Sequence, residues 1–416
     1  MRVLFAVNPE KSTFLYLAPM AWALRTAGHE VRVASQPGFA DVITQAGLTA
    51  VPVGRDVDKW RGTEPELLEQ SRAGLPSPWD ILETDKEPSW DELREAQEHA
   101  VASIHRPDNV PMLAGLVEFA RAWQPDLVVW EPFCLAGPVA AKACGAAHAR
   151  MLFSVDVFGL TRERFRRARP ADGADPLADW LGAYGRKYGF AFTEDMTTGH
   201  FTIDQFPASL QDHADLDYVR TQYVPYGGPA VLPDWLKRPA ERPRVGLTLG
   251  LTATEIFTGY TVPLREVLTE LSTLDIEVVA TVAEAEQEKL GTLPDNVRVV
   301  SYVPWHALVP TCSAIVHHAG AATLLTTSRY PVPQLAVHYH FDQPILGRKL
   351  AEHGAGLALH TTEATGETVR EAVRRLLVEP EFRRRAVALR GEIHSAPSPN
   401  DLVPRLEELT ARHRTR

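Results

Sequence analysis

The densest group of residues that could do chemistry lies at 315–323, where an apolar run ends in two histidines. Four small residues follow, and a helical pattern then begins. Such a strand-to-helix turn leaves backbone N–H groups free at a helix N-terminus, beside the positive end of the helix dipole. The pattern predicts a site for a diphosphate group, although a plain, closely packed turn fits the same spacing. The predicted contacts are His318, Gly320, Ala321, Ala322 and Thr323.

Strands alternate with helices in two halves of the chain. The first half opens with a buried apolar run at 2–8, and the second restarts with another at 244–250 after a proline-rich stretch. Buried runs that alternate with helices are typical of a doubly wound α/β fold with a parallel sheet. The predicted division is a first domain at 1–207, a linker at 208–243, a second domain at 244–395, and a last helix at 396–416 that packs back on the first domain.

Charge and composition exclude several kinds of partner. The chain has 416 residues with 43 basic and 53 acidic side chains, a formal net charge of -10. Such a chain lacks the basic surface that phosphate backbones and anionic membranes require, so we expect no nucleic-acid or membrane partner. The three cysteines form no CxxC pair, which disfavours a disulfide framework or a cysteine-based zinc site. No apolar stretch approaches the roughly 18 residues of a membrane span, so the expected location is the cytoplasm.

Several familiar catalytic motifs are missing from the chain. Residues 8–13, which follow the first predicted strand, contain no glycine, so the GxGxxG dinucleotide fingerprint is absent there. The chain also has no P-loop motif, no HExxH pair and no GxSxG elbow. Nicotinamide, P-loop, zincin and α/β-hydrolase chemistry are therefore disfavoured.

The histidine-containing turn resembles the donor-binding segment of nucleotide-sugar-dependent glycosyltransferases of the GT-B fold. The usual bacterial form of that segment reads His-His-Gly-Gly-Ala-Gly-Thr, and Ala319 and Ala322 stand here at two of its glycines. Alanine keeps the turn small but restricts the backbone, so phosphate binding is expected to survive if both residues have a φ below zero.

Two flanking stretches extend this resemblance to the rest of a nucleotide sugar. The stretch at 302–308 resembles the family's base-binding loop, and an Asp-Gln pair resembles the residues that bind the donor sugar. On spacing alone, a buried aromatic loop and a simple turn remain open for these two stretches. The resemblance implies that Tyr302, Val303 and Trp305 hold the base, that Asp342 and Gln343 hold the sugar, and that Thr252 adds a phosphate or sugar contact.

Segments at 27–37, 47–54, 123–132 and 199–204 resemble glycosyltransferases of macrolide and anthracycline biosynthesis, so the resemblance covers the whole chain. It implies a GT-B fold of two facing Rossmann-like domains with parallel sheets, the first of which binds the acceptor. It also implies inverting, metal-independent transfer of a deoxysugar or aminodeoxysugar from a thymidine diphosphate (TDP) sugar to a hydrophobic polyketide aglycone. The TDP-sugar is a co-substrate, and no cofactor or metal is expected. A cytochrome P450-like auxiliary protein and a homodimer are partners that the resemblance allows.

One position departs from the resembled family. An inverting transferase needs a base for the acceptor proton, and most of the family has a histidine for this within a Ser-His pair at the first helix. This chain has Ser12-Thr13, and we expect Thr13 to be the helix N-cap because its hydroxyl is no base at neutral pH. The alternative bases are Glu10, His105, Glu131, His338 and His340.

Other mechanisms and functions stay open beside a replacement base. Thr13 could orient the acceptor while His318 and the helix N-terminus stabilise the departing diphosphate. A non-catalytic or weakly active donor-binding homologue that assists a partner transferase would also explain Thr13 and the altered glycine turn. A nucleotide-sugar 2-epimerase shares the two-domain architecture but needs no aglycone pocket, so the Trp-rich insertion at 54–98 argues against it.

Overall fold

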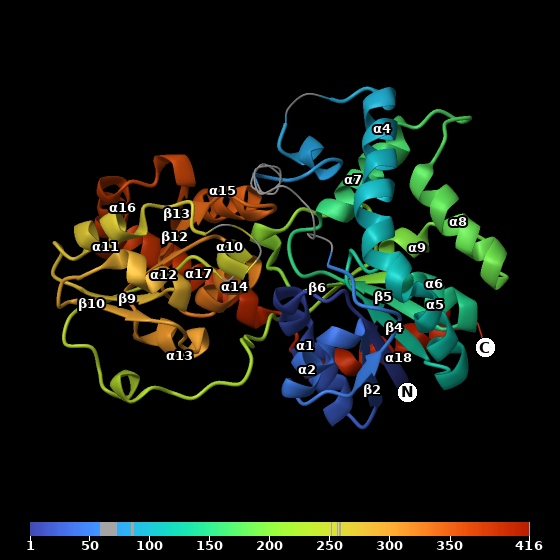
Figure 1. Ribbon diagram of the computed structural model, residues 1–416, viewed down its shortest axis with the longest axis horizontal. Helices are drawn as coiled ribbons and strands as arrows, with labels where there is room; N and C mark the ends of the chain where they lie inside the picture. Colours follow the sequence, from blue (N-terminus) through green and yellow to red (C-terminus); the bar gives the residue numbers. More distant parts are fainter. Residues whose placement is uncertain (59–72, 85–86, 251, 256, 258, 416) are drawn as a thin grey trace.

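Two parallel sheets form the fold (Figure 1). This computed structural model describes residues 1–58, 73–84, 87–250, 252–255, 257 and 259–415. Within these residues the first sheet has the strand order β3-β2-β1-β4-β5-β6-β7 and the second has the order β10-β9-β8-β11-β12-β13. The strands are β1 (Arg2–Ala6), β2 (Glu30–Ser35), β3 (Ala50–Pro52), β4 (Leu127–Trp130), β5 (Ala147–Met151), β6 (Phe201–Asp204), β7 (Tyr218–Arg220), β8 (Arg244–Thr248), β9 (Glu277–Thr281), β10 (Val297–Val300), β11 (Ala314–His317), β12 (Gln334–His338) and β13 (Gly356–His360). This architecture confirms the predicted α/β fold class.

Helices connect these strands and cover the sheets. They are α1 (Lys11–Thr26), α2 (Ala40–Gln45), α4 (Trp90–Ala100), α5 (Arg106–Trp123), α6 (Ala136–Cys144), α7 (Val157–Ala168), α8 (Pro176–Tyr188), α9 (Asp195–Thr198), α10 (Thr252–Glu255), α11 (Leu264–Leu271), α12 (Glu284–Gln287), α13 (Trp305–Leu308), α14 (Ala321–Ser328), α15 (Gln343–His353), α16 (Gly366–Val378), α17 (Pro380–Ser395) and α18 (Pro399–His413). A π-helical turn, Val101–His105, joins α4 to α5. Among the helices of the described residues, none combines the length and apolar character that crossing a bilayer requires.

The first strand shows why continuous apolar runs form these sheets. Val3 and Phe5 belong to one buried cluster, and Leu4 and Ala6 belong to another. Successive side chains of a strand point to opposite faces, so both faces of this sheet are covered and every position of the strand core must be apolar. The chemistry-bearing residues are therefore displaced to the strand ends and the loops that follow them.

The residues predicted as a linker contain one strand. β7 pairs with β6, with Thr202 opposite Tyr218, so the first sheet extends past residue 207. A three-residue strand carries too little periodicity to be seen in the sequence, because its neighbour and not its own pattern stabilises it. The domain limits at 207, 243 and 395 stay a prediction.

The last helix lies against the first domain. α18 packs against α1 and β5, and Leu402, Leu406 and Leu409 on its apolar side are buried. Figure 1 places the labelled N- and C-terminal ends of the chain in this same half of the molecule. The chain therefore starts and ends in the first domain after completing the second.

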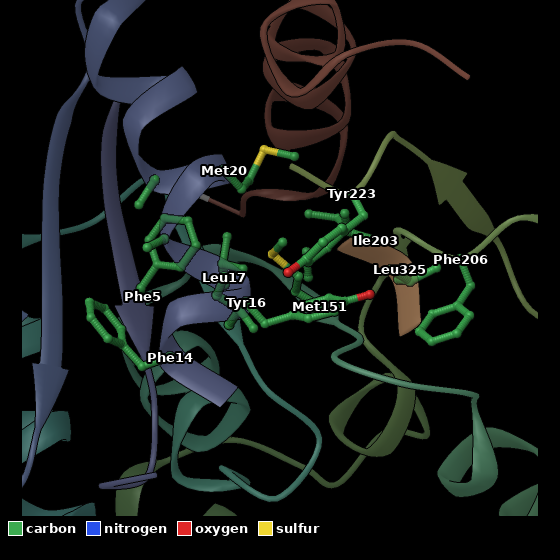
Figure 2. Close-up of a cluster of buried hydrophobic side chains, with 14 of the residues drawn as sticks. Phe5, Phe14, Tyr16, Leu17, Met20, Met151, Ile203, Phe206, Tyr223 and Leu325 are labelled. Carbon is green, nitrogen blue, oxygen red and sulfur yellow. The ribbon is translucent and has the colours of Figure 1, made fainter. Parts of the chain in front are cut away.

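An apolar seam joins the two domains. Tyr16 of α1 lies 4.8 Å from Tyr223, measured between ring centroids, and Leu325 of α14 belongs to the same buried cluster (Figure 2). The Tyr223 and Thr326 hydroxyl oxygens are 3.3 Å apart, within hydrogen-bond distance. The helix that carries the predicted diphosphate site, α14, thus packs against residues of the first domain through Leu325 and Thr326.

The start of the first helix differs from the prediction. α1 begins at Lys11, and its N-cap is Glu10, whose carboxylate accepts the Ser12 N–H at 3.4 Å. The expectation that Thr13 is the N-cap was wrong. A carboxylate is also favoured by the helix dipole at this end, so Glu10 takes the cap and Thr13 falls inside the first turn.

Acid is expected to destabilise the fold through its buried histidines. Burial lowers the pKa of His105 to about 4 and that of His317 to about 3, below the unfolded value of 6.5. The unfolded chain therefore binds protons first as the pH falls below about 6.5, and each of these histidines removes about 2 kcal/mol of stability by pH 5. Asp342, whose pKa burial raises to about 6, acts in the opposite direction below that pH. Urea unfolding at pH 7.5 and pH 5.0 checks this, and an equal midpoint at the two pH values would contradict it.

Candidate functional site

The predicted diphosphate turn lies at the carboxyl end of the second sheet. β11 ends at His317 and α14 begins at Ala321, with Gly320 as the N-cap residue. No described side chain caps this helix, so the backbone N–H groups of its first turn are available to a ligand. Ligands of open parallel sheets bind at this end of the strands, where helix N-termini favour anions.

The two histidines of the turn have different environments. His317 is fully buried, its Nε2 lies 2.9 Å from Oε1 of Gln334, and its Nδ1 accepts the Ala319 N–H at 2.9 Å. Because Nδ1 is an acceptor, the ring proton is on Nε2 and is donated to Gln334. These bonds, together with a pKa that burial lowers to about 3, make His317 a neutral structural residue that fixes the turn.

The His318 ring lies between two glycines. A Cβ added at Gly250 would lie 2.7 Å from the ring, and one at Gly320 would overlap it, so only glycine leaves space at both positions. Burial lowers the pKa of His318 to about 4, so the imidazole is neutral at pH 7. The ring lines a pocket, a hydrogen bond to the Thr248 backbone favours its protonated form, and its Nδ1 has no hydrogen-bond partner among the described residues.

The backbone of the turn meets the condition of a negative φ at only one of the two alanines. Ala319 has a φ of +62°, whereas Ala322 lies in the first turn of α14. The condition is therefore met at Ala322 and not at Ala319. An L-residue in this region costs about 1 kcal/mol, and the hydrogen bond from the Ala319 N–H to His317 holds it there. The turn keeps the left-handed shape that glycine adopts most easily.

His318 shares its pocket with residues that follow β8 and β12, the strands on either side of β11. Gln343 and His340 come from the loop and helix after β12, and the loop after β8 adds the aromatic rings of Phe257 and Tyr260. The structure thus brings together His318, Gln343 and His340. The pocket's aromatic residues, Phe257, Tyr260 and Tyr339, were not predicted, although the loops that carry them follow β8 and β12.

Thr252 is the first residue of α10, a short helix in the loop after β8. Its backbone therefore begins a segment that reaches the same pocket through Ala253. The Thr252 side chain lies outside the described residues, so its predicted contact stays a prediction.

Asp342 lies at the contact between the two domains. Its Oδ2 accepts a hydrogen bond from the hydroxyl of Ser154, which follows β5 in the first domain. Its side chain is buried, and burial raises its pKa to about 6. Ser154 was not predicted from the sequence, because nothing local distinguishes it from other loop serines.

Gln343 supports the loop in front of it. Its Oε1 accepts the backbone N–H groups of Tyr339 at 3.2 Å and of His340 at 3.0 Å. The amide nitrogen is the remaining polar group of this side chain. Gln343 can therefore shape the loop with one atom and address a ligand with the other.

This division predicts different outcomes for two substitutions. Gln343→Leu removes the acceptor of both N–H groups and is expected to lower the unfolding free energy by about 1–3 kcal/mol. Gln343→Glu keeps an acceptor oxygen and is expected to retain the stability while losing the amide donor. Urea unfolding of both variants checks the loop contact, and equal stability of the two variants would contradict it.

Of the predicted base-binding residues, Trp305 contacts α14. The Trp305 N–H donates to Oγ1 of Thr327 at 3.2 Å, and the Thr327 hydroxyl donates to the Thr323 carbonyl at 2.8 Å. Tyr302 is 49% exposed and its hydroxyl donates to the Gly227 carbonyl. The Val303 side chain is buried in a hydrophobic cluster, so it can address a base only through its backbone. The roles of these residues stay predictions.

The candidate bases are dispersed. Thr13 is 8% exposed in the first turn of α1. The two carboxylate oxygens of Glu131 accept the N–H groups of Asn8 at 3.3 Å and Phe133 at 2.8 Å. Glu131 thus ties two loop backbones together.

The remaining candidates lie on different elements. Glu10 accepts a hydrogen bond from the Ser12 hydroxyl, and His105 is buried inside the first domain. His338 lies beside His360, and His340 lines the His318 pocket. The identity of the base stays a prediction.

An aromatic cluster occupies the domain contact near Asp342. We define it by Trp79, Phe133, Phe153 and Phe158 of the first domain and Phe341 of the second. Phe341 lies 6.0 Å from Phe133 and 6.3 Å from Trp79, measured between ring centroids. Such a surface suits an apolar ligand, because aromatic side chains supply large contact area.

One group of potential metal ligands lies away from this pocket, at the amino ends of β5 and β6. His148 and His200 face Oδ2 of Asp195 at 2.8 and 3.4 Å, and Lys142 lies 2.6 Å from the same atom. Trp130 and a backbone N–H donate to the Nδ1 atoms of the two rings, so both carry their proton on Nε2. A metal ligand must be deprotonated, so these contacts favour a hydrogen-bonded ion cluster.

The chain is similar to known proteins along its whole length. Residues 22–250 match the family profile "Erythromycin biosynthesis protein CIII-like, N-terminal domain", and residues 265–409 match its C-terminal counterpart. The 10-deoxymethynolide desosaminyltransferase of Streptomyces venezuelae is 43% identical over 100% of this chain and 98% of its own length. The aklavinone 7-beta-L-rhodosaminyltransferase of Streptomyces galilaeus is also 43% identical, over 100% of this chain and 97% of its own.

A solved structure matches the whole architecture. The glycosyltransferase VinC, whose crystal structure is a complex with DTDP, aligns with a TM-score of 0.88 and 39% identity over 99% of this chain and 100% of its own. This match confirms the predicted GT-B fold with its two facing domains. Since both profiles and the full-length relatives match, the chain belongs to the family of erythromycin biosynthesis protein CIII-like glycosyltransferases.

Proposed function

We propose that this protein transfers a deoxysugar or aminodeoxysugar from a TDP-sugar to a hydroxyl group of a polyketide aglycone. The pocket that contains His318, at the N-terminus of α14, is the observation that carries the donor part of this proposal. Full-length relatives named for desosaminyl and rhodosaminyl transfer support the sugar class and the acceptor class. The second domain binds the donor and the first binds the acceptor.

The donor is held by groups of different chemistry. The first-turn N–H groups of α14 and the His318 N–H bind the diphosphate, because donors at a helix N-terminus match its negative charge. The loop with Trp305 binds the base. Asp342 and Gln343 hydrogen-bond the sugar hydroxyls, and Ser154 holds the Asp342 carboxyl from the opposite domain.

The acceptor oxygen forms a bond to the anomeric carbon of the sugar as the bond from that carbon to the diphosphate breaks, and the acceptor proton passes to one of the predicted bases. Thr13 orients the acceptor hydroxyl, while stabilisation of the departing diphosphate supplies most of the lowering of the barrier. Transfer proceeds with inversion and needs no metal, because the α14 N-terminus and His318 balance the developing charge.

Mass spectrometry tests the function. The chain is incubated with TDP-deoxysugars and with 10-deoxymethynolide or aklavinone, and a sugar-linked product is expected. Donor binding without transfer or hydrolysis would instead favour the non-catalytic homologue. The assay is run with the chain alone and with a cytochrome P450-like auxiliary protein, and size-exclusion chromatography reports whether the chain is a homodimer.

Thr13 is tested by two substitutions. Thr13→Val keeps the size and removes the hydroxyl, so turnover is expected to fall about two- to tenfold through loss of one neutral hydrogen bond of about 0.5–1.5 kcal/mol. Thr13→Ser keeps the hydroxyl and is expected to keep turnover. Steady-state kinetics and melting temperatures measure both variants, and full turnover of Thr13→Val would leave Thr13 a packing residue only.

A further inference from the structure

A second pocket lies inside the first domain, on the side of Trp79 that faces His105. We name it the polar recess. The residues that line it and enter the argument are Trp79, Gln97, His105, Phe158, Thr161 and Arg162. His105 stands at the end of the π-helical turn before α5, and Thr161 stands on α7. Two elements far apart in the sequence thus meet around one cavity.

Two buried polar atoms of the recess have no hydrogen-bond partner among the described residues, namely Nδ1 of His105 and Oγ1 of Thr161. Their side chains are 5% and 3% exposed. Buried polar groups are nearly always paired, because an unpaired one forfeits its hydration. Helical threonines commonly donate to the carbonyl four residues earlier, as Thr410 does to Leu406 at 2.6 Å, whereas Thr161 makes no such bond. Both groups therefore lack the partner that a buried polar group normally has.

The charge of the recess limits the ligand to a neutral group. Arg162 is its cation, and two carboxylates balance the charge of the guanidinium: Asp175 accepts hydrogen bonds at 2.7 and 2.9 Å and Glu194 at 2.7 and 2.9 Å. Burial lowers the pKa of His105 to about 4, so its imidazole is neutral at pH 7 and offers one donor and one acceptor. A hydroxyl or carbonyl group fits these partners, and an anion does not.

The recess borders the aromatic cluster. Trp79 lies 6.1 Å from His105 and 6.3 Å from Phe341, measured between ring centroids, and Phe158 lies 5.2 Å from Trp79. Trp79 and Phe158 thus belong both to the recess wall and to the aromatic surface at the domain contact. A molecule on that surface has the recess beside it.

We propose that the polar recess receives a neutral hydroxyl or carbonyl group of the acceptor, which His105 and Thr161 recognise by hydrogen bonds. This inference rests on the proposed function and deepens it by naming acceptor-specificity residues. It gives His105 a binding role in place of the predicted role as a base.

The test uses substitutions that remove the polar atoms and keep the side-chain size. Thr161→Val and His105→Phe are expected to leave TDP affinity unchanged and to raise the KM for 10-deoxymethynolide or aklavinone about fivefold or more, because a neutral hydrogen bond to the acceptor is lost. Each removes an unpaired buried polar group, so the melting temperature without acceptor is expected to stay equal or rise. Thr410→Val is the matched control: it loses a paired hydroxyl, so its melting temperature is expected to fall while its acceptor KM is unchanged.

The outcomes separate this inference from the proposed function. An unchanged acceptor KM in both recess variants, or a crystal structure with bound acceptor in which the recess holds only water, would overturn the recess while leaving the transferase intact. Binding of TDP by the wild type without binding of either acceptor would overturn the acceptor class and the recess together. If His105→Phe fails to fold, the acceptor KM of Thr161→Val alone tests whether the recess binds the acceptor.

Discussion

His318→Ala is expected to weaken binding of thymidine diphosphate by about ten- to a hundredfold, the equivalent of one charge-assisted hydrogen bond of about 1.5–3 kcal/mol. In the free protein, burial lowers the pKa of His318 to about 4. A bound diphosphate adds negative charge beside the ring and raises that pKa. Binding is therefore coupled to proton uptake, and wild-type affinity is expected to be higher at pH 6 than at pH 8.

Gly320→Ala tests the same ring by steric means. An added Cβ would overlap the His318 imidazole, so the variant is expected to displace it and to lose a similar amount of affinity. The double variant is expected to lose little more than either single variant, because both changes remove one interaction. Isothermal titration calorimetry at pH 6 and pH 8 measures all of these variants. His99→Ala, on the exposed side of α4, serves as the control, and unchanged affinity of His318→Ala would remove the donor-site assignment.

Asp342→Ala is expected to lower kcat/KM for sugar transfer about a hundredfold or more, because it removes hydrogen bonds to the sugar from a buried carboxylate. The Ser154 hydroxyl donates to one carboxyl oxygen, so the proposed bonds to the sugar fall to the other oxygen. The proposed role requires the carboxylate form, which accepts the sugar hydroxyls. Because burial raises the pKa of Asp342 to about 6, kcat/KM is expected to decline as the pH falls below about 6.

Three variants distinguish the effect of the Asp342 charge from the effect of the position of its carboxylate, namely Asp342→Ala, Asp342→Asn and Ser154→Ala. Asp342→Asn keeps the shape and removes the ionisation, so its residual activity is expected to lose the decline near pH 6. Ser154→Ala leaves the carboxylate in place without its cross-domain partner, and a smaller loss of kcat/KM is expected. Melting temperatures measure whether each variant retains the fold, and some loss of stability is expected in Asp342→Ala because the buried Ser154 hydroxyl loses its acceptor. Wild-type activity of Asp342→Ala would exclude a role for it in transfer.

Local patterns predicted those parts of the molecule that depend on neighbours in the sequence. The buried apolar runs at β1 and β8 predicted parallel strands, because a strand covered on both faces needs apolar residues throughout. The turn before α14 was predicted from small residues that follow a strand. The predicted N-cap, Thr13, was wrong because the side chains of Glu10 and Thr13 can both accept a hydrogen bond at a helix start. The backbone geometry at residue 10 makes Glu10 the N-cap.

Long-range contacts decided the chemistry around these elements. The sequence already indicated His318 as the diphosphate contact, and long-range contacts supply the physical reason: Gln334 hydrogen-bonds His317, while two glycines make space for the His318 ring. The bond between Ser154 and Asp342 joins residues 188 positions apart, and no local pattern specifies such a pair. The aromatic cluster and the polar recess likewise collect residues from several loops.

The sequence by itself determined the two-sheet fold, the strand-to-helix turn and the glycosyltransferase resemblance, because periodicity and short motifs are properties of adjacent residues. Only the tertiary structure decided that Gln334 fixes His317, that Asp342 is held from the opposite domain, and that His105 and Thr161 share a cavity. The physical reason is that burial, pKa and hydrogen-bond partners are set by residues brought together when the two sheets pack, and these residues are distant in the chain.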